Sequence, residues 1–139
     1  MKTLYLVACV SMKQTCPAPA QDLYISPWFR MAKTLVKQEK VDWFILSAKH
    51  GLVAPSTVIG PYNIALSHMA AQERREWAEK VCGQLEAANY FADCVIVLAG
   101  ENYRRGLLPW LETRYSHVQV PMRGLAIGEQ LSWLKTQIS

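Results

Sequence analysis

The chain has 139 residues, of which 51% are hydrophobic and 19% are charged. This composition excludes a disordered chain and suffices for a domain with its own core. No apolar run reaches the roughly 18 residues that a membrane-spanning helix needs, so we expect no membrane partner. Fifteen Lys and Arg against 11 Asp and Glu give a net charge of +4. That charge permits an anionic partner, but charge alone favours a solvated basic face.

The cysteines and the N-terminus favour a reducing, cytoplasmic location. The four cysteines are Cys9, Cys16, Cys82 and Cys94. No pair has CxxC spacing, and nothing resembles a zinc site or a disulfide framework. The apolar run 4–10 followed by Ala18-Pro19-Ala20 imitates a signal peptide. Because Lys13 interrupts that pattern, we interpret the run as a first strand.

The first predicted element is therefore a strand over 4–10, nearly continuous in apolar residues and typical of a strand covered on both faces. A loop with two prolines follows over 11–25. Ser26-Pro27 then predicts a helix start, because the hydroxyl caps free amides and proline suits the first helical position. A second strand is predicted over 43–47, whereas 48–70 is too polar and too interrupted by Pro and Gly for a long regular element.

The second half of the chain repeats this alternation. An apolar stripe predicts a helix from the early seventies to about residue 90, and a third strand follows over 94–99. Residues 102–111 predict a helix that Pro109 should distort or divide. A weaker strand is predicted over 117–120, and a last helix has apolar residues at helical spacing from Ile127 to Ile138.

The alternation predicts one α/β domain over residues 1–139, a three-layer α/β/α fold with a mainly parallel four-stranded sheet. In such sheets, ligands bind outside the carboxyl ends of the strands. We therefore expect a site formed by the segments that follow the four strands. These segments contribute Ser11, Lys13, Asp22, Tyr24, Ser47, Lys49, His50, Glu101, Asn102, Tyr103, Arg104, Arg123 and Gly124.

Most of these groups also have a structural interpretation. Lys49-His50-Gly51 can be a plain turn in which Gly51 takes a positive φ. Asp22 can brace the long loop, and Glu101 can do no more than begin a helix. The phosphate-loop, dinucleotide, nucleophile-elbow and zinc-protease motifs are absent from the sequence. No spacing indicates a metal site, so no cofactor is predicted.

Several segments resemble the domain-of-unknown-function family 6884, over almost the whole chain. They are 9–13, 17–29, 44–52 (Phe-Ile-Leu-Ser-Ala-Lys-His-Gly-Leu), Pro61-Tyr62-Asn63, Tyr103-Arg104 and 124–134. The Ser-Ala-Lys-His-Gly-Leu stretch is the most specific of them, and the family's name implies no reaction. The chain departs from the family's pattern at two places. Ser11-Met12 stands where the family often has Lys-Ser, so one loop lysine is lost, and Asn63 stands where it often has aspartate. Any role that needs two loop lysines, or a carboxylate at position 63, is weakened.

A shorter likeness concerns the loop after the first strand. Its cysteine, Ser/Lys and Tyr-x-Ser arrangement is similar to the Pro-Cys-Ser-x-x-Lys-Pro-Tyr-Ser loop of archaeosine synthase, which acts on a modified base in tRNA. The predicted three-layer architecture also suits the uracil-DNA glycosylase fold class, which that domain resembles. By analogy, this likeness implies processing of a nucleobase or nucleic acid.

The first functional hypothesis is an enzyme that cleaves the N-glycosidic bond of a modified nucleobase in DNA or RNA. Such chemistry needs a pocket for an extruded base and an electrostatic partner for an oxocarbenium-like sugar. Asp22, or alternatively Glu101, would stabilise that cation or orient water, and His50 would polarise the base. A lysine could instead attack the sugar as an amine, in a lyase variant, and Lys49 is the lysine among the catalytic candidates. The substrate-binding candidates are Ser11, Lys13, Tyr24, Ser47, Tyr62, Asn63, Tyr103, Arg104, Arg123 and Gly124.

The alternative is a module that binds a nucleotide or nucleic acid without chemistry. It uses the same basic groups for phosphates and gives Asp22 and Glu101 structural roles. The two hypotheses differ in whether a carboxylate at the sheet edge is needed. In either case the chain is expected to be a monomer or a homodimer, the latter through the final helix.

Overall fold

The computed structural model describes residues 1–8 and 13–139, and it has a central sheet of five strands. Their order is β4-β3-β1-β6-β7, with β4 antiparallel to β3 and the other pairs parallel. The strands are β1 (Thr3–Ala8), β3 (Asp42–Ser47), β4 (Gly51–Val53), β6 (Cys94–Leu98) and β7 (His117–Gln119). The α/β class and the mainly parallel sheet are thus confirmed.

The predicted strand count is one too low, because β4 lies in the segment that was expected to be irregular. The same segment contains β5 (Val58–Ile59), which pairs with β2 (Ala18–Pro19), and the short 3-10 helix η1 (Leu66–His68). Strands of two or three residues are too short to show the alternation that predicts a strand. Pairing partners far along the chain define them instead, and a local pattern does not contain that information.

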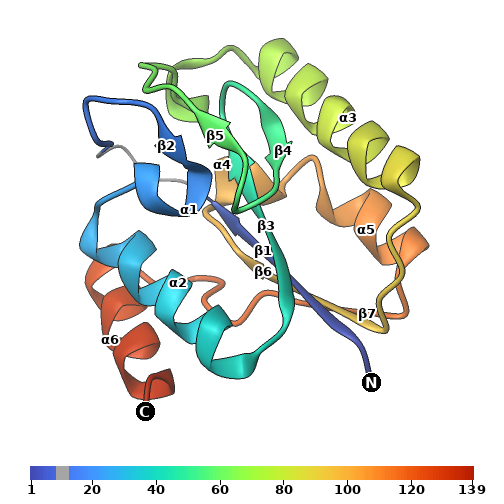
Figure 1. Ribbon diagram of the computed structural model, residues 1–139. Coiled ribbons are helices and arrows are strands. Elements are labelled where there is room, and N and C mark those ends of the chain that lie inside the picture. The colour runs from blue at the N-terminus through green and yellow to red at the C-terminus, as the bar shows by residue number, and fades with distance from the viewer. Residues whose placement is uncertain (9–12) are drawn as a thin grey trace.

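Two helical layers enclose the sheet (Figure 1). Buried side chains between the sheet and α2 and α6 form one hydrophobic core, and those between the sheet and α3 and α5 form the other. The helices are α1 (Ala20–Leu23), α2 (Pro27–Glu39), α3 (Ala71–Ala88), α4 (Glu101–Arg104), α5 (Leu108–Arg114) and α6 (Ile127–Gln137). This is the predicted three-layer arrangement. No helix formed by residues 1–8 or 13–139 is both long and apolar enough to cross a membrane.

Two local predictions about helix ends are also confirmed. Ser26 Oγ accepts a hydrogen bond from Phe29 N, and Pro27 is the first residue of α2. Pro109 divides the predicted helix into α4 and α5, and it lies in the first turn of α5. Proline is tolerated there because the first turn of a helix needs no donor from its backbone nitrogen.

Strand β1 lies in the middle of the sheet and carries both cores. Leu4 and Leu6 pack on the α3 side, while Tyr5 and Val7 pack on the α2 side. All four are at most 8% exposed, which explains why this strand is an unbroken apolar run.

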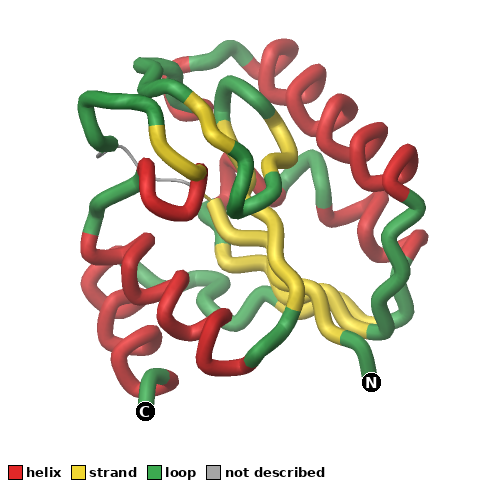
Figure 2. The backbone as a smooth tube through the Cα atoms, in the orientation of Figure 1, coloured by secondary structure: helices red, strands yellow, loops and turns green. Residues whose placement is uncertain are grey.

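The chain reverses its direction of travel across the sheet beside β1. From β1 it moves through α2 to β3 and β4, and it then returns through α3 to β6 on the other side of β1. The loops after β1 and β6 therefore diverge at their carboxyl ends, which is the position where doubly wound sheets bind ligands. The β2–β5 pair and α1 lie beyond this edge (Figure 2).

Candidate functional site

A pocket of about 420 Å³ lies at this switch point, and we call it the switch-point pocket. Three segments line it: Lys13 after β1, residues 63–68 before α3, and residues 100–103 after β6. Its volume falls within the range of small-molecule sites. Five of the residues predicted to form the site meet here, namely Lys13, Asn63, Glu101, Asn102 and Tyr103.

Lys13 is held on the faces of two tyrosines. Its Nζ lies 4.5 Å from the ring centroid of Tyr62 and 5.8 Å from that of Tyr24. The backbone fixes this position, because Lys13 and Tyr24 form an antiparallel bridge and Gln14 N donates to Leu23 O at 2.8 Å. Cation–π attraction therefore places an ammonium group in the wall of the pocket.

A buried chain of hydroxyl groups ties three segments together behind that lysine. Tyr24 Oη lies 2.6 Å from Tyr62 Oη, which in turn lies 2.7 Å from Ser47 Oγ. Ser47 Oγ also accepts a hydrogen bond from His50 N at 3.1 Å. Ser47 is fully buried and Tyr24 is 1% exposed, so neither presents a surface to a ligand. Their role in this structure is to hold Tyr62.

His50 packs edge-on against Tyr62, with 5.7 Å between the ring centroids, but it does not line the switch-point pocket. Desolvation lowers the pKa of His50, and the cations Lys49 and Lys80 lower it further. The exposed Lys49 lies in the turn between β3 and β4, where its carbonyl accepts from Lys80 Nζ at 3.4 Å. Lys49 is thus also outside the pocket.

The lowered pKa of His50 predicts a loss of stability in mild acid. Below the usual histidine pKa of 6.5, the unfolded chain binds a proton that the folded chain binds less readily. The free energy of unfolding should therefore fall as the pH falls from about 7.5 to about 5.5. Thermal melts across this range should show a steeper fall for the wild type than for His50→Gln. Parallel curves for the two proteins would show that His50 does not contribute.

The two candidate carboxylates lie in different places. Asp22 is on α1, and its Oδ1 lies 2.7 Å from Lys33 Nζ of α2. It lines a separate depression of about 310 Å³ and not the switch-point pocket. Glu101, in contrast, lines the switch-point pocket at the start of α4. A hydrogen bond from Arg105, together with its charge, lowers the pKa of Glu101, so this carboxylate is ionised near neutral pH.

The other predicted residues lie around the pocket or away from it. Arg104 Nη1 donates to Ala99 O at 3.1 Å and so braces the end of β6. Tyr103 packs edge-on against Trp77 at 5.4 Å. Arg123 and Gly124 lie in the turn after β7 and do not line the pocket. Ser11 lies outside the described residues.

Sequence reasoning missed Ser67 and His68, which also line the pocket. Both belong to the segment before α3, where no periodic pattern indicates an element and no motif singles out a residue. Only their distance from Lys13 and Glu101 in the folded chain makes them candidates. Among the described residues, no group of three or more His, Cys, Asp or Glu side chains is arranged to hold a metal ion.

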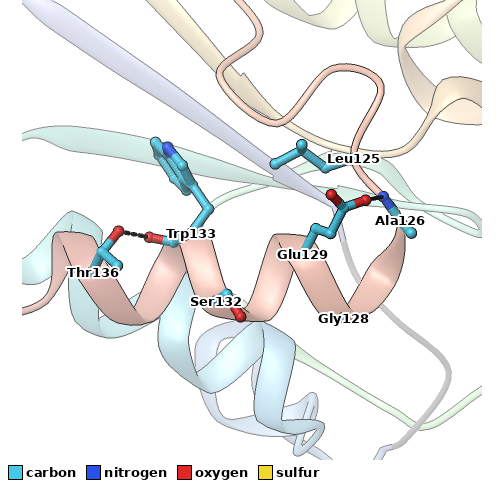
Figure 3. A pocket seen from close by; sticks show the side chains of 7 residues that line it. All are labelled: Leu125, Ala126, Gly128, Glu129, Ser132, Trp133 and Thr136. Carbon is cyan, nitrogen blue, oxygen red and sulfur yellow. Dashed lines mark hydrogen bonds between the residues drawn. The ribbon is translucent and has the colours of Figure 1, made fainter.

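A second hollow, of about 680 Å³, runs along α6 (Figure 3). Leu125 and Trp133 form its apolar part, and Glu129 accepts a hydrogen bond from Ala126 N at 3.0 Å. This hollow is more open than the switch-point pocket and shares no lining residue with it. Its carboxylate is occupied in capping α6, which leaves the switch-point pocket as the better candidate for chemistry.

Comparison with known proteins gives one family and one relative. The sequence model of the "Family of unknown function (DUF6884)" matches residues 4–136. "Uncharacterized protein YfjM" of Bacillus subtilis (strain 168) is 28% identical over 152 residues, covering 99% of this chain and 96% of that protein. No solved structure matches the chain.

Proposed function

The chain belongs to the DUF6884 family, and from the geometry of its pocket we propose that it cleaves the N-glycosidic bond of a modified nucleobase in a nucleic acid. The observation that supports this proposal is the meeting of three chemical groups at the switch point. Glu101 supplies an ionised carboxylate, Asn63 an amide, and Lys13 an ammonium group in one pocket.

Each group has a place in the reaction. The bond between C1′ and the base nitrogen breaks, and its electron pair leaves with the base. The sugar becomes an oxocarbenium-like cation, which the Glu101 carboxylate stabilises. Water then attacks C1′ and gives up a proton, so that the products are the protonated free base and the abasic sugar. Asn63 hydrogen-bonds an edge of the extruded base, and Lys13 stabilises the negative charge that develops on it.

Detection of the released base tests this proposal directly. Purified protein is mixed with DNA and with tRNA that carry modified bases, and free bases are measured by mass spectrometry. We expect one modified base to appear in proportion to protein and time. Unchanged base content in both nucleic acids, with protein that still binds them, would contradict the enzymatic proposal.

A binding module without chemistry is the second candidate, and one observation favours it. The Glu101 carboxylate is already paired with Arg105, at 2.5 Å between Oε1 and Nη2, as a carboxylate in a purely structural role would be. This candidate predicts salt-sensitive retention of an oligonucleotide with no base released. Either function suits the reducing cytoplasm, since the described cysteines Cys16, Cys82 and Cys94 are free thiols.

A further inference from the structure

Another pocket, of about 300 Å³ and open to solvent, adjoins the switch-point pocket. Asn102 lines both pockets, so the two are neighbours across this one residue. Three arginines line this pocket, which we call the arginine pocket: Arg74 and Arg75 from the start of α3, and Arg105 from the end of α4. Neither Arg74 nor Arg75 was a candidate from the sequence, whereas Arg105 belongs to the polar segment expected at the sheet edge after the third strand.

The arginines are held by partners that use few of their donors. Arg74 Nη1 donates to Leu66 O at 3.3 Å and to Met69 O at 2.6 Å. Arg75 Nη2 donates to Gln72 Oε1 at 3.2 Å, and Arg105 Nη2 to Glu101 Oε1 at 2.5 Å. A guanidinium group has five N–H donors. These contacts therefore orient the arginines without exhausting their capacity to bind an anion.

A glycine brings the two arginine-bearing segments together. A Cβ at Gly106 would come within 2.6 Å of Ala78 Cβ on α3, closer than real Cβ atoms come to one another. Glycine thus lets the chain after α4 lie directly against α3. This approach places Arg105 in the same pocket as Arg74 and Arg75.

The acidic groups nearby leave the pocket cationic. Glu101 is paired with Arg105, and Glu73 accepts from Ala70 N at 3.1 Å in capping α3. No acidic side chain is among the residues described as lining the arginine pocket. Like-charged guanidinium groups in one hollow repel each other, and a bound anion relieves that repulsion.

We propose that the arginine pocket binds a phosphate group of the nucleotide unit whose base occupies the switch-point pocket. Guanidinium groups suit this ligand because their planar forks match phosphate oxygens with paired hydrogen bonds. The identity of the neighbouring base rests on the proposed function, whereas the recognition of phosphate by these arginines does not. Because Asn102 lines both pockets, a phosphate bound in the arginine pocket would fix the position of the extruded nucleotide relative to the switch-point pocket.

Binding measurements with one probe that carries bases and one that carries none test this assignment. The probes are a labelled single-stranded oligonucleotide of roughly 12 nucleotides and an abasic strand of the same length. We expect Arg75→Gln to weaken binding of both probes about tenfold and to reduce the salt dependence of log Kd by about 0.7. Arg114→Gln removes the same charge from α5, outside both pockets, and should leave both values near those of the wild type.

The outcomes separate this inference from the proposed function. Equal, small effects of Arg75→Gln and Arg114→Gln would overturn the arginine pocket as a phosphate site, whether or not a base is released. If the abasic strand binds in an Arg75-dependent way and no base is released from any substrate, the phosphate site stands and the enzymatic proposal fails. A double variant Arg75→Gln/Arg105→Gln should lose more affinity for the abasic strand than either single variant.

Discussion

Replacing Glu101 by Gln is expected to slow base release by at least about a hundredfold, while the Kd for the nucleic acid stays within a few-fold of that of the wild type. The substitution keeps the shape of the side chain and removes the charge that would stabilise the oxocarbenium-like sugar. A ground-state nucleoside carries no positive charge at C1′, so binding should depend little on this carboxylate. Single-turnover release of the base, measured beside binding, separates the two effects.

Asp22→Asn is the matched control, because it removes the same charge from the other candidate carboxylate. Asp22 pairs with Lys33 on the surface, where its side chain is 47% exposed. Loss of an exposed ion pair costs about 1 kcal/mol or less, so the variant should fold and release the base at the wild-type rate. A slow Asp22→Asn variant beside a fully active Glu101→Gln variant would show that Asp22, and not Glu101, is the catalytic carboxylate.

The layout of the central sheet could be predicted because its main strands are apolar runs that can be recognised from their own sequence. The apolar run that forms β1 lies between both cores, and the Ser26-Pro27 pair starts α2 as its chemistry requires. Strand β4 could not be predicted, since its three residues become a strand only by pairing with β3. Its partner in the fold, not its own sequence, defines it.

The candidate site was predicted in part for a related reason. The rule that ligands bind at carboxyl ends of strands predicts that Lys13, Glu101 and Tyr103 lie close together, and all three line one pocket. The same rule does not say which way a long loop directs its side chains. Residues 13–24 fold back on themselves, and α1 turns Asp22 outward to Lys33.

The arginine pocket could not be predicted from the sequence, for a different reason. In the sequence, Arg74 and Arg75 stand between glutamates opposite an apolar stripe, which is typical of a solvated helix face. Only the approach of Gly106 to α3 turns that face into the wall of a pocket. A pattern along one helix carries no information on what packs beside it.

Gly51→Ala is expected to lower the free energy of unfolding by about 2–4 kcal/mol. Gly51 has φ +74°, a left-handed conformation that costs other residues roughly 1–2 kcal/mol. An added Cβ would also collide with Gln84 Oε1. Gln84 accepts from Leu52 N at 2.8 Å and donates to His50 O at 3.3 Å, so moving its side chain would break both of these hydrogen bonds. Urea unfolding followed by circular dichroism measures the loss.

Two further variants divide this effect into its parts. Gly60→Ala adds the same methyl group where nothing lies within 4 Å of the new Cβ, and it should change stability by less than about 0.5 kcal/mol. Gln84→Ala removes the hydrogen bonds and the collision, so adding Gly51→Ala to it should cost only the backbone strain. Equal stability of Gly51→Ala and wild type would contradict both causes. Gly51 directly follows His50, so we expect the same strain to shift the His50 ring, which packs on Tyr62. Because Lys13 lies on the face of Tyr62, a less stable β4 should also disturb the position of Lys13 in the switch-point pocket.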